Sequence, residues 1–329
     1  MTPGSRTDLA GRATRGRRTT RWLLTRLAGS VFVLWAVATL TFFAIRLIPG
    51  DPAEAVLGGP GSQASEETLE QVRQDYGLDQ PLLAQYLSAL GRVASGDLGT
   101  SYALKVPVAE LLWAQLGGTL VLAVAALALA WLVALGLSLW STAGGRVAAA
   151  VGQGIELTSA ALPHFWLATV LIAVFSTLLG WFPPVSTGDL SGLVLPVVTL
   201  AIPLSGFLAQ VMRETLLDTL DSPFVLSARA RGEGEAGIRL RHAIRHAALP
   251  GISLSGWALG YLISGAVVVE TIFARPGLGR TLLQAVTLRD VPVVTGVVLV
   301  VAVVYILMTI LTDAASRLAD PRLRLEEAR

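Results

Sequence analysis

Few residues of this chain have a type and spacing that could support catalysis. Its single lysine, Lys105, does not follow the GxxxxGK[ST] pattern that lets a P-loop nucleotidase cradle phosphates. The three histidines, His164, His242 and His246, lack the HExxH spacing of a zinc site, and no GxSxG sequence indicates a serine hydrolase. The absence of cysteine excludes thiolate ligands, thiol nucleophiles and disulfides. We therefore expect no catalytic residue and no metal or cofactor bound by this chain.

Ionisable residues near the apolar segments could instead carry a proton or an ion, because a charge in hydrocarbon is costly and often functional. His164, Arg213 and Glu270 are the candidates for a translocation path or gate, with Glu156 and Glu214 nearby in the sequence. A structural explanation competes at each position. Side chains at segment ends can snorkel to water, and a lone histidine such as His164 is more often a packing donor than a proton relay.

The composition indicates an integral membrane protein, since 53% hydrophobic residues, 15% charged residues and a mean hydropathy of +0.64 exceed soluble-domain values. Six windows contain no Asp, Glu, Lys or Arg: 27–45, 111–145, 157–188, 190–212, 246–269 and 291–312. Each can hold one spanning helix, because a hydrocarbon core of about 30 Å needs about 20 helical residues. The predicted fold class is an all-α membrane protein with six transmembrane helices.

The charge distribution predicts cytoplasmic termini, because loops rich in arginine stay inside. Residues 1–26 contain seven arginines and one acid, whereas residues 49–113 contain three basic and nine acidic residues. The predicted organisation is a basic cytoplasmic tail (1–26), a first transmembrane helix (27–47), an extracytoplasmic helical segment (48–110), a core of five spans (111–316) and a second cytoplasmic tail (317–329). The sequence pI of about 9.3 follows from the inside loops and implies no nucleic-acid partner.

The extracytoplasmic segment is predicted to contain two short amphipathic helices. Ser65 can cap the first, with Glu66 and Glu67 in its first turn, and Gly77 ends it. Pro81 opens the second, which residues 96–99 close. Neither helix can bury much surface alone, so we expect both to pack on the membrane part as a lid or docking ledge.

The loop between the fourth and fifth windows is the most informative segment. Residues 224–250 read FVLSARARGEGEAGIRLRHAIRHAALP and combine five arginines with a short apolar stripe. Ala228, Gly232 and Ile238 offer small and apolar contacts, and the glycines permit a break between two short helices. This pattern favours a rigid cytoplasmic element that another protein grips, although a solvated charged face explains the composition as well.

This loop resembles the coupling loop, or EAA loop, of ABC importer permeases in the dipeptide and oligopeptide group. Further segments resemble the same group in the same order: LIPGDPA (47–53), YGLDQPLLAQY (76–86), GDLGTS (96–101), GAVVVETIFARPGLGR (265–280), RDVPVV (289–294) and LADPRLR (318–324). The resemblance covers nearly the whole chain. It implies a type I ABC importer fold in the bacterial cytoplasmic membrane, with a cytoplasmic ATPase seated against a coupling loop at 218–249.

The resemblance also implies the residues that contact the ATPase: Phe224, Ser227, Ala228, Arg229, Ala230, Arg231, Gly232, Ile238, His242, Leu249 and Pro250. It implies a non-hydrolytic permease subunit of an importer for dipeptides or oligopeptides, embedded in membrane lipid. The partners would be a second homologous permease, two ATP-binding subunits that use ATP and Mg, and an extracytoplasmic solute-binding protein. A secondary transporter driven by an ion gradient and a non-transporting scaffold remain the alternatives.

Overall fold

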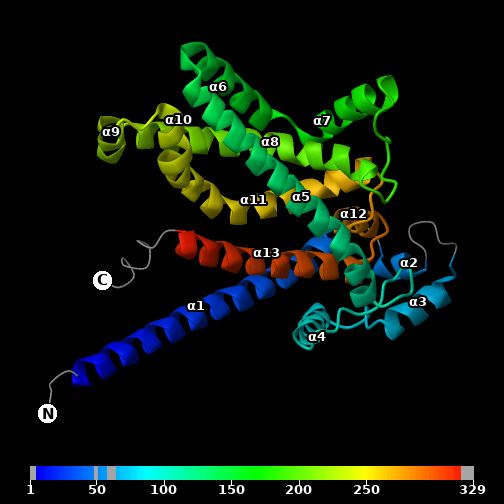
Figure 1. The fold of residues 1–329 in the computed structure, drawn as a ribbon. Helices are drawn as coiled ribbons and strands as arrows, with labels where there is room; N and C mark the ends of the chain where they lie inside the picture. The colour runs from blue at the N-terminus through cyan, green and yellow to red at the C-terminus, as the bar shows by residue number, and fades with distance from the viewer. Residues whose placement is uncertain (1–4, 48–50, 58–63, 320–329) are drawn as a thin grey trace. The chain divides into compact units, whose positions relative to one another are not determined.

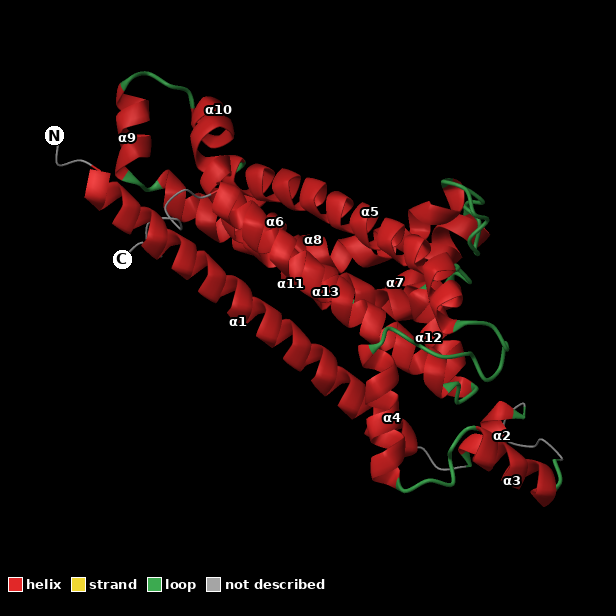
Figure 2. Cartoon of the chain, turned by 90° about the horizontal axis from the view of Figure 1, so that it is seen from below, coloured by secondary structure: helices red, strands yellow, loops and turns green. Residues whose placement is uncertain are grey.

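The structure is a computed structural model that describes residues 5–47, 51–57 and 64–319. The described residues are almost entirely helical and form no strand, apart from an isolated bridge between Thr100 and Pro107 (Figure 2). The α-helices are α1 (Ser5–Arg46), α2 (Pro52–Val56), α3 (Glu66–Asp75), α4 (Leu82–Ala94), α5 (Val108–Ala143), α6 (Gly145–Ala161), α7 (His164–Leu171), α8 (Ser191–Leu220), α9 (Pro223–Ala230), α10 (Glu235–Gly237), α11 (Ile244–Ile272), α12 (Leu278–Thr287) and α13 (Val291–Ala319) (Figure 1). Two π-helical segments, η1 (Ile172–Leu178) and η2 (Ile238–Ala243), continue α7 and precede α11.

Among the described residues, five helical segments are long and apolar enough to cross a membrane: Leu24–Arg46, Val108–Ala143, Ser191–Leu220, Glu235–Ile272 and Val291–Ala315. They confirm five of the six predicted windows. Residues 48–50 of LIPGDPA and residues 320–324 of LADPRLR lie outside the described residues. The predicted basic tail 1–26 is helical from Ser5 onward, as part of α1.

The third predicted window differs from a single straight helix. The apolar segment begins at Gly145, and α6 and α7 meet at an angle of 104° around residues 162 and 163 (Figure 1). Pro163 explains the break, because a proline disfavours the helical conformation of the residue before it. Leu162 accordingly has extended angles, with φ −72° and ψ 124°. The bent pair counts as a sixth span if its two arms cross the membrane together.

The chain divides into two compact units. The N-terminal unit comprises residues 1–108 and 289–306, and the core unit comprises residues 109–288 and 307–329. Each unit has its own buried apolar residues.

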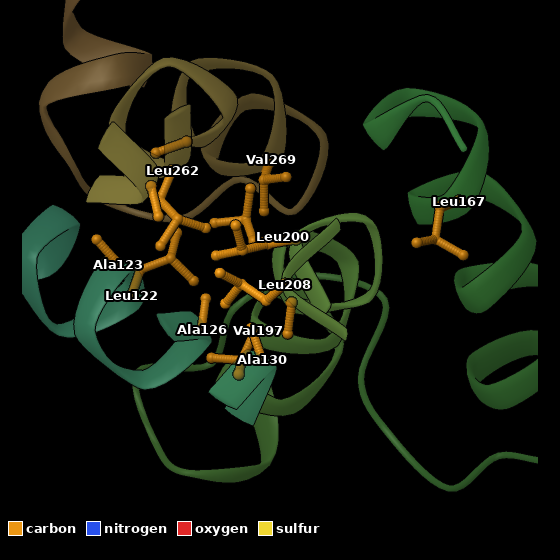
Figure 3. Packing of buried hydrophobic residues seen from close by; sticks show 14 of the residues in the cluster. Leu122, Ala123, Ala126, Ala130, Leu167, Val197, Leu200, Leu208, Leu262 and Val269 are labelled. Carbon is orange, nitrogen blue, oxygen red and sulfur yellow. The ribbon is translucent and has the colours of Figure 1, made fainter. Parts of the chain in front are cut away.

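Helix α8 is the centre of the core unit. Leu200, Leu204 and Leu208 are fully buried in one apolar cluster with residues of α5, α7 and α11 (Figure 3). Helix α5 contributes alanines at helical spacing: Ala123, Ala126, Ala130 and Ala134. Small side chains on one helix face allow neighbouring helices to pack closely. Such packing drives helix association in a membrane, because lipid tails are as apolar as the side chains and the hydrophobic effect contributes little.

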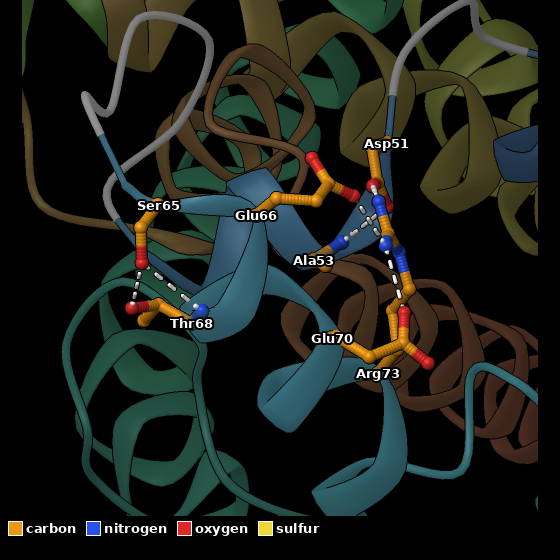
Figure 4. Close-up of polar contacts among 7 residues, drawn as sticks. All are labelled: Asp51, Ala53, Ser65, Glu66, Thr68, Glu70 and Arg73. Atoms are coloured by element: carbon orange, nitrogen blue, oxygen red, sulfur yellow. Dashed lines mark hydrogen bonds and ion pairs between the residues drawn. The ribbon is translucent and has the colours of Figure 1, made fainter.

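The two short helices predicted in the N-terminal unit are confirmed. Ser65 caps α3, and its Oγ accepts a hydrogen bond of 3.3 Å from the Thr68 amide (Figure 4). Gly77, with φ +63°, follows the end of α3 in the left-handed conformation that glycine favours. Helix α4 packs on α1 through Tyr86, whose hydroxyl lies 2.8 Å from Thr39 Oγ1.

An ion-pair cluster joins α2 to α3. Arg73 contacts Asp51 at 2.6 Å, Glu66 at 3.0 Å and Glu70 at 3.0 Å (Figure 4). Burial raises the pKa of Asp51, but hydrogen bonds from the Ala53 amide and from Arg73 outweigh it and hold that pKa below its ordinary value. Asp51 therefore stays ionised and fixes the start of α2 against α3.

Candidate functional site

The predicted coupling loop folds as two short helical segments joined by a tight turn. Pro223 occupies the first turn of α9, a position where its missing N–H costs no hydrogen bond. Helix α9 ends before Gly232, which has φ +82°, and the chain then returns through α10 and η2 into α11. Helices α9 and α10 lie side by side with this turn between them (Figure 2). The expected break between two helices is thus present at the predicted glycine.

The inner face of the loop has its own small apolar cluster. Val225, Ala228 and Ile238 are fully buried there against Leu216 and Leu220 of α8. The loop is therefore packed on the end of a central helix of the core unit, rather than hanging free. A force applied to the loop would reach α8 directly through these contacts.

Charged residues hold the two arms of the loop together. Glu235 accepts from Arg229 at 2.8 Å across the turn and lies 3.5 Å from Arg239. His242 Nε2 lies 2.9 Å from Glu233 Oε2. The acids of the GEGE sequence thus bind three basic side chains of the loop itself. This arrangement leaves fewer charges to be neutralised by a partner than the sequence suggests.

The outer face of the loop presents apolar side chains to solvent. Leu226 is 67% exposed, Leu240 58% and Phe224 43%, and the exposed residues of α9 also include Ser227 and Ala230. Arg231 and Gly232 are exposed at the turn. An exposed apolar group rimmed by polar residues is typical of a protein interaction site.

The structure separates the predicted loop residues into three sets by exposure. Phe224, Ser227, Arg229, Ala230, Arg231 and Gly232 are exposed, whereas Ala228 and Ile238 are buried in the loop's own cluster and His242, Leu249 and Pro250 are half-buried. Leu226 and Leu240 are exposed on the same loop and were not among the residues that the sequence analysis selected. Leu226 could have been found from helical spacing, because it lies on the opposite side of α9 from the buried pair Val225 and Ala228.

Arg213 is one half of a buried ion pair in the core unit. Its Nε lies 2.8 Å from Glu156 Oε2 and 3.1 Å from Oε1, and the Glu156 side chain has no solvent exposure. The pair joins α6 to α8. These helices approach closely, because a Cβ on Gly206 would lie 2.6 Å from the Glu156 carbonyl oxygen.

Glu270 is also buried, and its carboxylate accepts three hydrogen bonds. Its carboxylate accepts from Thr119 Oγ1 at 2.6 Å, from the Gly279 amide at 2.8 Å and from the Arg280 amide at 3.1 Å. Thr119 Oγ1 accepts in turn from the Leu278 amide at 2.8 Å. The carboxylate therefore caps the first turn of α12, where free amides and the helix dipole favour negative charge.

The glycines of the ARPGLGR sequence make room for this carboxylate. A Cβ on Gly277 would overlap the Glu270 carboxylate, and a Cβ on Gly279 would lie 2.5 Å from the Val267 Cα. Helix α12 can therefore lie against the end of α11 only with glycine at both positions. Glu270, Thr119 and these two glycines form one unit, which we call the α12 anchor.

His164 lies at the bend between α6 and α7 and belongs to a row of rings. Ring centroids are 5.1 Å apart for Phe207 and Trp257, 5.5 Å for Trp257 and Tyr261, and 5.2 Å for Tyr261 and His164. His164 Nε2 is buried without a hydrogen-bond partner, and Trp257 Nε1 and the Tyr261 hydroxyl also have none within the described residues. We call these four residues the aromatic row.

The aromatic row carries polar ring atoms that part of the exposed surface of α5 lacks. The exposed large side chains of α5 that face away from the core include Val121, Val124 and Leu132, which are purely aliphatic. Aliphatic faces suit lipid, whereas a polar atom without a partner costs several kcal/mol in hydrocarbon. The row is therefore better suited to water, to a partner subunit or to a polar ligand than to lipid.

The fold defines a multi-helix membrane protein with a packed, partly exposed loop between two of its spans. The family of binding-protein-dependent transport system inner membrane components matches residues 134–325, and the N-terminal part of the same kind of component matches residues 19–123. The chain belongs to this family. It is a multi-pass inner membrane protein and acts as the permease component of an ABC importer.

Two relatives resemble the chain over almost their whole length. A protein of Brucella abortus (strain 2308), provisionally named as a peptide transport system permease protein, is 36% identical over 318 residues, 93% of this chain and 100% of that protein. The glutathione transport system permease protein GsiC of Salmonella typhi is 33% identical over 306 residues, 92% of this chain and 98% of that protein.

A solved structure shows the same fold. The inward-facing MetNI methionine ABC transporter aligns with a TM-score of 0.52 and 16% identity, over 64% of this chain and 96% of that chain. A second crystal form of the same transporter aligns with a TM-score of 0.53 and 17% identity. Membership of this family implies that the chain works with an ATPase and a binding protein. The family description itself names the dependence on a binding protein.

Proposed function

We propose that this chain is a permease subunit that imports dipeptides or oligopeptides and forms half of the translocation path. Two relatives support the cargo class, since they are named for peptide and for glutathione transport, and glutathione is itself a peptide. A second homologous permease supplies the other half of the path. The solute-binding protein delivers the peptide, and two separate ATP-binding subunits use ATP and Mg to drive the cycle.

The observation that carries the coupling role is the two-sided packing of the loop 218–249. Its buried face is fixed to α8, and its exposed face presents Phe224, Leu226 and Leu240. Closure of the ATPases moves this loop, and α8 transmits the movement to the path. This is rigid-body switching, in which one packed element has two positions. The chain itself hydrolyses nothing in this cycle.

Replacing Gly232 with valine tests the coupling role. Gly232 has φ +82°, and a left-handed conformation costs an L-residue about 1–2 kcal/mol, which corresponds to roughly a five- to thirtyfold change in population. We expect peptide-stimulated ATP hydrolysis by the assembled complex in proteoliposomes to fall by about that factor, while membrane insertion stays normal.

Gly234→Val is the matched control for Gly232→Val. Gly234 lies two residues away with φ −71°, and no atom lies within 4 Å of its added Cβ. Valine tolerates this extended conformation, so stimulation should stay within twofold of the unmodified complex. Equal stimulation in both variants would contradict the docking role of the turn.

We further propose that the aromatic row lines the path on this subunit. Its unpartnered polar atoms would hydrogen-bond to peptide groups or water, and its ring faces would pack against cargo side chains. Arg213 and Glu270, which the sequence offered as path or gate residues, are engaged in helix contacts that hold α8 and α12 in place. We propose for them a role in fixing the helices around the path, and for His164 a place in its wall.

Trp257→Ala tests this wall. Loss of an aromatic pair with cargo costs about 0.5–1.5 kcal/mol, so uptake of phenylalanine-containing peptides should fall about three- to tenfold. Trp166→Ala is the matched control, because Trp166 is 48% exposed and Trp257 47%, and only Trp257 belongs to the row. Radiolabelled uptake at one fixed rate of ATP hydrolysis is the measurement. Equal losses in both variants would exclude the row from the path.

A further inference from the structure

The N-terminal unit contains a cavity of about 960 Å³ that the coupling role does not use. Its walls come from the last turns of α1, from the end of α3 and the residues that follow it (74–80), from α4, from the loop 97–102 and from residues 289–295. The apolar segment of α1 ends at Arg46, and that of α13 begins at Val291. The cavity therefore lies where two membrane segments end, at the level where hydrocarbon gives way to lipid headgroups.

One side of the cavity is apolar and belongs to membrane segments. Ala38, Phe42 and Ile45 line it from α1, at positions separated by four and three residues along one helix face. Val291 and Thr295 line it from the start of α13. This wall offers a short apolar surface at the depth of the hydrocarbon. A fully soluble ligand would gain little from such a surface.

The other side of the cavity has a surplus of positive charge. Arg46, Arg92 and Arg289 line it, and within the described residues none of the three forms an ion pair. Arg46 is held in place, with its guanidinium 3.5 Å over the Phe42 ring and Nη2 2.5 Å from Gln85 Oε1. Arg46 is thus positioned by neutral groups and keeps its full charge toward the cavity.

The two carboxylates that line the cavity already have partners nearby. Asp97 accepts from the Gly99 amide at 2.9 Å, and Asp75 accepts from Gln71 Nε2 at 2.9 Å. Neither forms a salt bridge with the arginines of the cavity. The arginines consequently have donors to spare for an anion, which guanidinium groups bind through paired hydrogen bonds.

Tyr102 adds a hydroxyl donor among the arginines. Its ring packs edge-on against Tyr76, with centroids 5.3 Å apart. The positive charges of Arg92 and Arg46 and the negative charge of Asp290, whose carboxylate is held by Ser101 and Ala103, act on its hydroxyl. Burial raises the pKa of Tyr102 despite these two arginines, so the phenol stays protonated at neutral pH. Its hydroxyl has no hydrogen-bond partner within the part of the chain described, and it can donate to an anion.

The backbone around Arg289 is fixed in a strained conformation. Arg289 has φ +56°, in the left-handed region that non-glycine residues rarely occupy. The next residue, Asp290, is buried and accepts from Ser101 Oγ at 2.5 Å and from the Ala103 amide at 3.1 Å. These bonds tie the start of α13 to the loop that carries Tyr102. The residues next to Arg289 and Tyr102 are therefore linked to each other, and both side chains line the cavity.

We propose that this cavity is a binding site for an anionic phospholipid. The phosphate lies among Arg92, Arg289 and Tyr102, and the first part of the acyl chains lies along Phe42 and Ile45. A basic cavity with an apolar wall at the ends of membrane segments matches a lipid, whose charge and hydrocarbon sit at these two levels. The bound lipid would join α1 and α4 to the start of α13. This site is independent of the proposed cargo.

Native mass spectrometry of the full purified chain tests the site. The chain is titrated with phosphatidylglycerol and with phosphatidylcholine that carry identical acyl chains. We expect about tenfold stronger retention of phosphatidylglycerol, because one charge-assisted contact is enough for a factor of ten. The double variant R92Q/R289Q should lose this preference, and Tyr102→Phe should weaken it several-fold while keeping the ring contact with Tyr76.

Arg146→Gln is the matched charge control. Arg146 is exposed on α6 in the core unit and does not line the cavity, so its removal should leave the preference unchanged. An unchanged preference in R92Q/R289Q, or equal retention of both lipids by the unmodified chain, would overturn the proposal. So would displacement of the lipid by an equal concentration of inorganic phosphate, because the apolar wall would then contribute nothing. In the assembled complex, photo-crosslinking from Ser88, which also lines the cavity, to the binding protein instead of lipid would overturn it as well.

Discussion

Glu270→Ala is expected to lower the free energy of unfolding of the core unit by about 3–5 kcal/mol. The change leaves Thr119 Oγ1 and two amides at the start of α12 without their acceptor in a buried site, and each unsatisfied buried donor costs about 1–3 kcal/mol. Stabilities of proteins are commonly about 5–15 kcal/mol, so this loss removes a large part of the margin. Denaturant titration of the full chain in nanodiscs is the measurement.

Three further variants test whether the loss of stability comes from the α12 anchor or from the removal of any carboxylate. Glu270→Gln keeps an acceptor for the two amides and should cost less than half as much as Glu270→Ala. Glu214→Ala removes an exposed carboxylate from α8 and should have no measurable effect. Gly277→Ala should resemble Glu270→Ala, because the added Cβ overlaps the carboxylate. Similar stability in Glu270→Ala and Glu214→Ala would refute the anchoring role.

The short helices of the N-terminal unit were predictable because their signals are local. Ser65 caps α3 three residues before the amide that it accepts from, and Gly77 lies at the turn after it. Such signals involve neighbours in the sequence and need no knowledge of the fold. The membrane segments were predictable for a similar reason, since length and hydropathy depend on composition alone.

The bend between α6 and α7 was not predictable from composition. Pro163 produces a 104° break, whereas Pro196 and Pro203 lie inside the continuous helix α8. A proline inside a membrane helix is tolerated where neighbouring groups satisfy the freed backbone or the packing holds the helix. Whether a proline breaks the helix depends on the residues that pack around it in the folded protein. Those tertiary contacts cannot be read from the local sequence.

The break between the two helices of the loop was predictable from its glycines, but the face that packs on α8 was not. The sequence placed Ala228 and Ile238 in the interface, and the structure buries both in the loop's own cluster. Helices as short as α9 allow several apolar faces, so the inner face is chosen by Leu216 and Leu220 of α8. The pairings of Glu270 with Thr119 and of Glu156 with Arg213 join residues 151 and 57 positions apart, and no local pattern reveals them.

Glu156→Met alone is expected to cost about 3–5 kcal/mol of stability, because it leaves the Arg213 guanidinium charged and nearly enclosed without its partner. Arg213→Met should cost a similar amount, since it leaves the fully buried Glu156 carboxylate uncompensated. The two charges lie between α6 and α8, which approach closely at Gly206. The Glu156 side chain has no solvent exposure and the Arg213 side chain only 13%, so neither charge is well hydrated in place of its partner.

The double variant E156M/R213M tests whether Glu156 and Arg213 stabilise the fold through their ion pair or through separate contacts. Replacing a buried ion pair with apolar side chains of similar volume is often neutral or stabilising, so the double variant should be more stable than either single variant. The exposed pair Arg229 and Glu235 is the matched control, because its side chains are half in water and its cycle should show no coupling beyond error. Additive losses at Glu156 and Arg213 would mean that each residue acts through other contacts. Coupling would instead show that the pair specifies how α6 lies on α8, and α8 is the helix on which the coupling loop is packed.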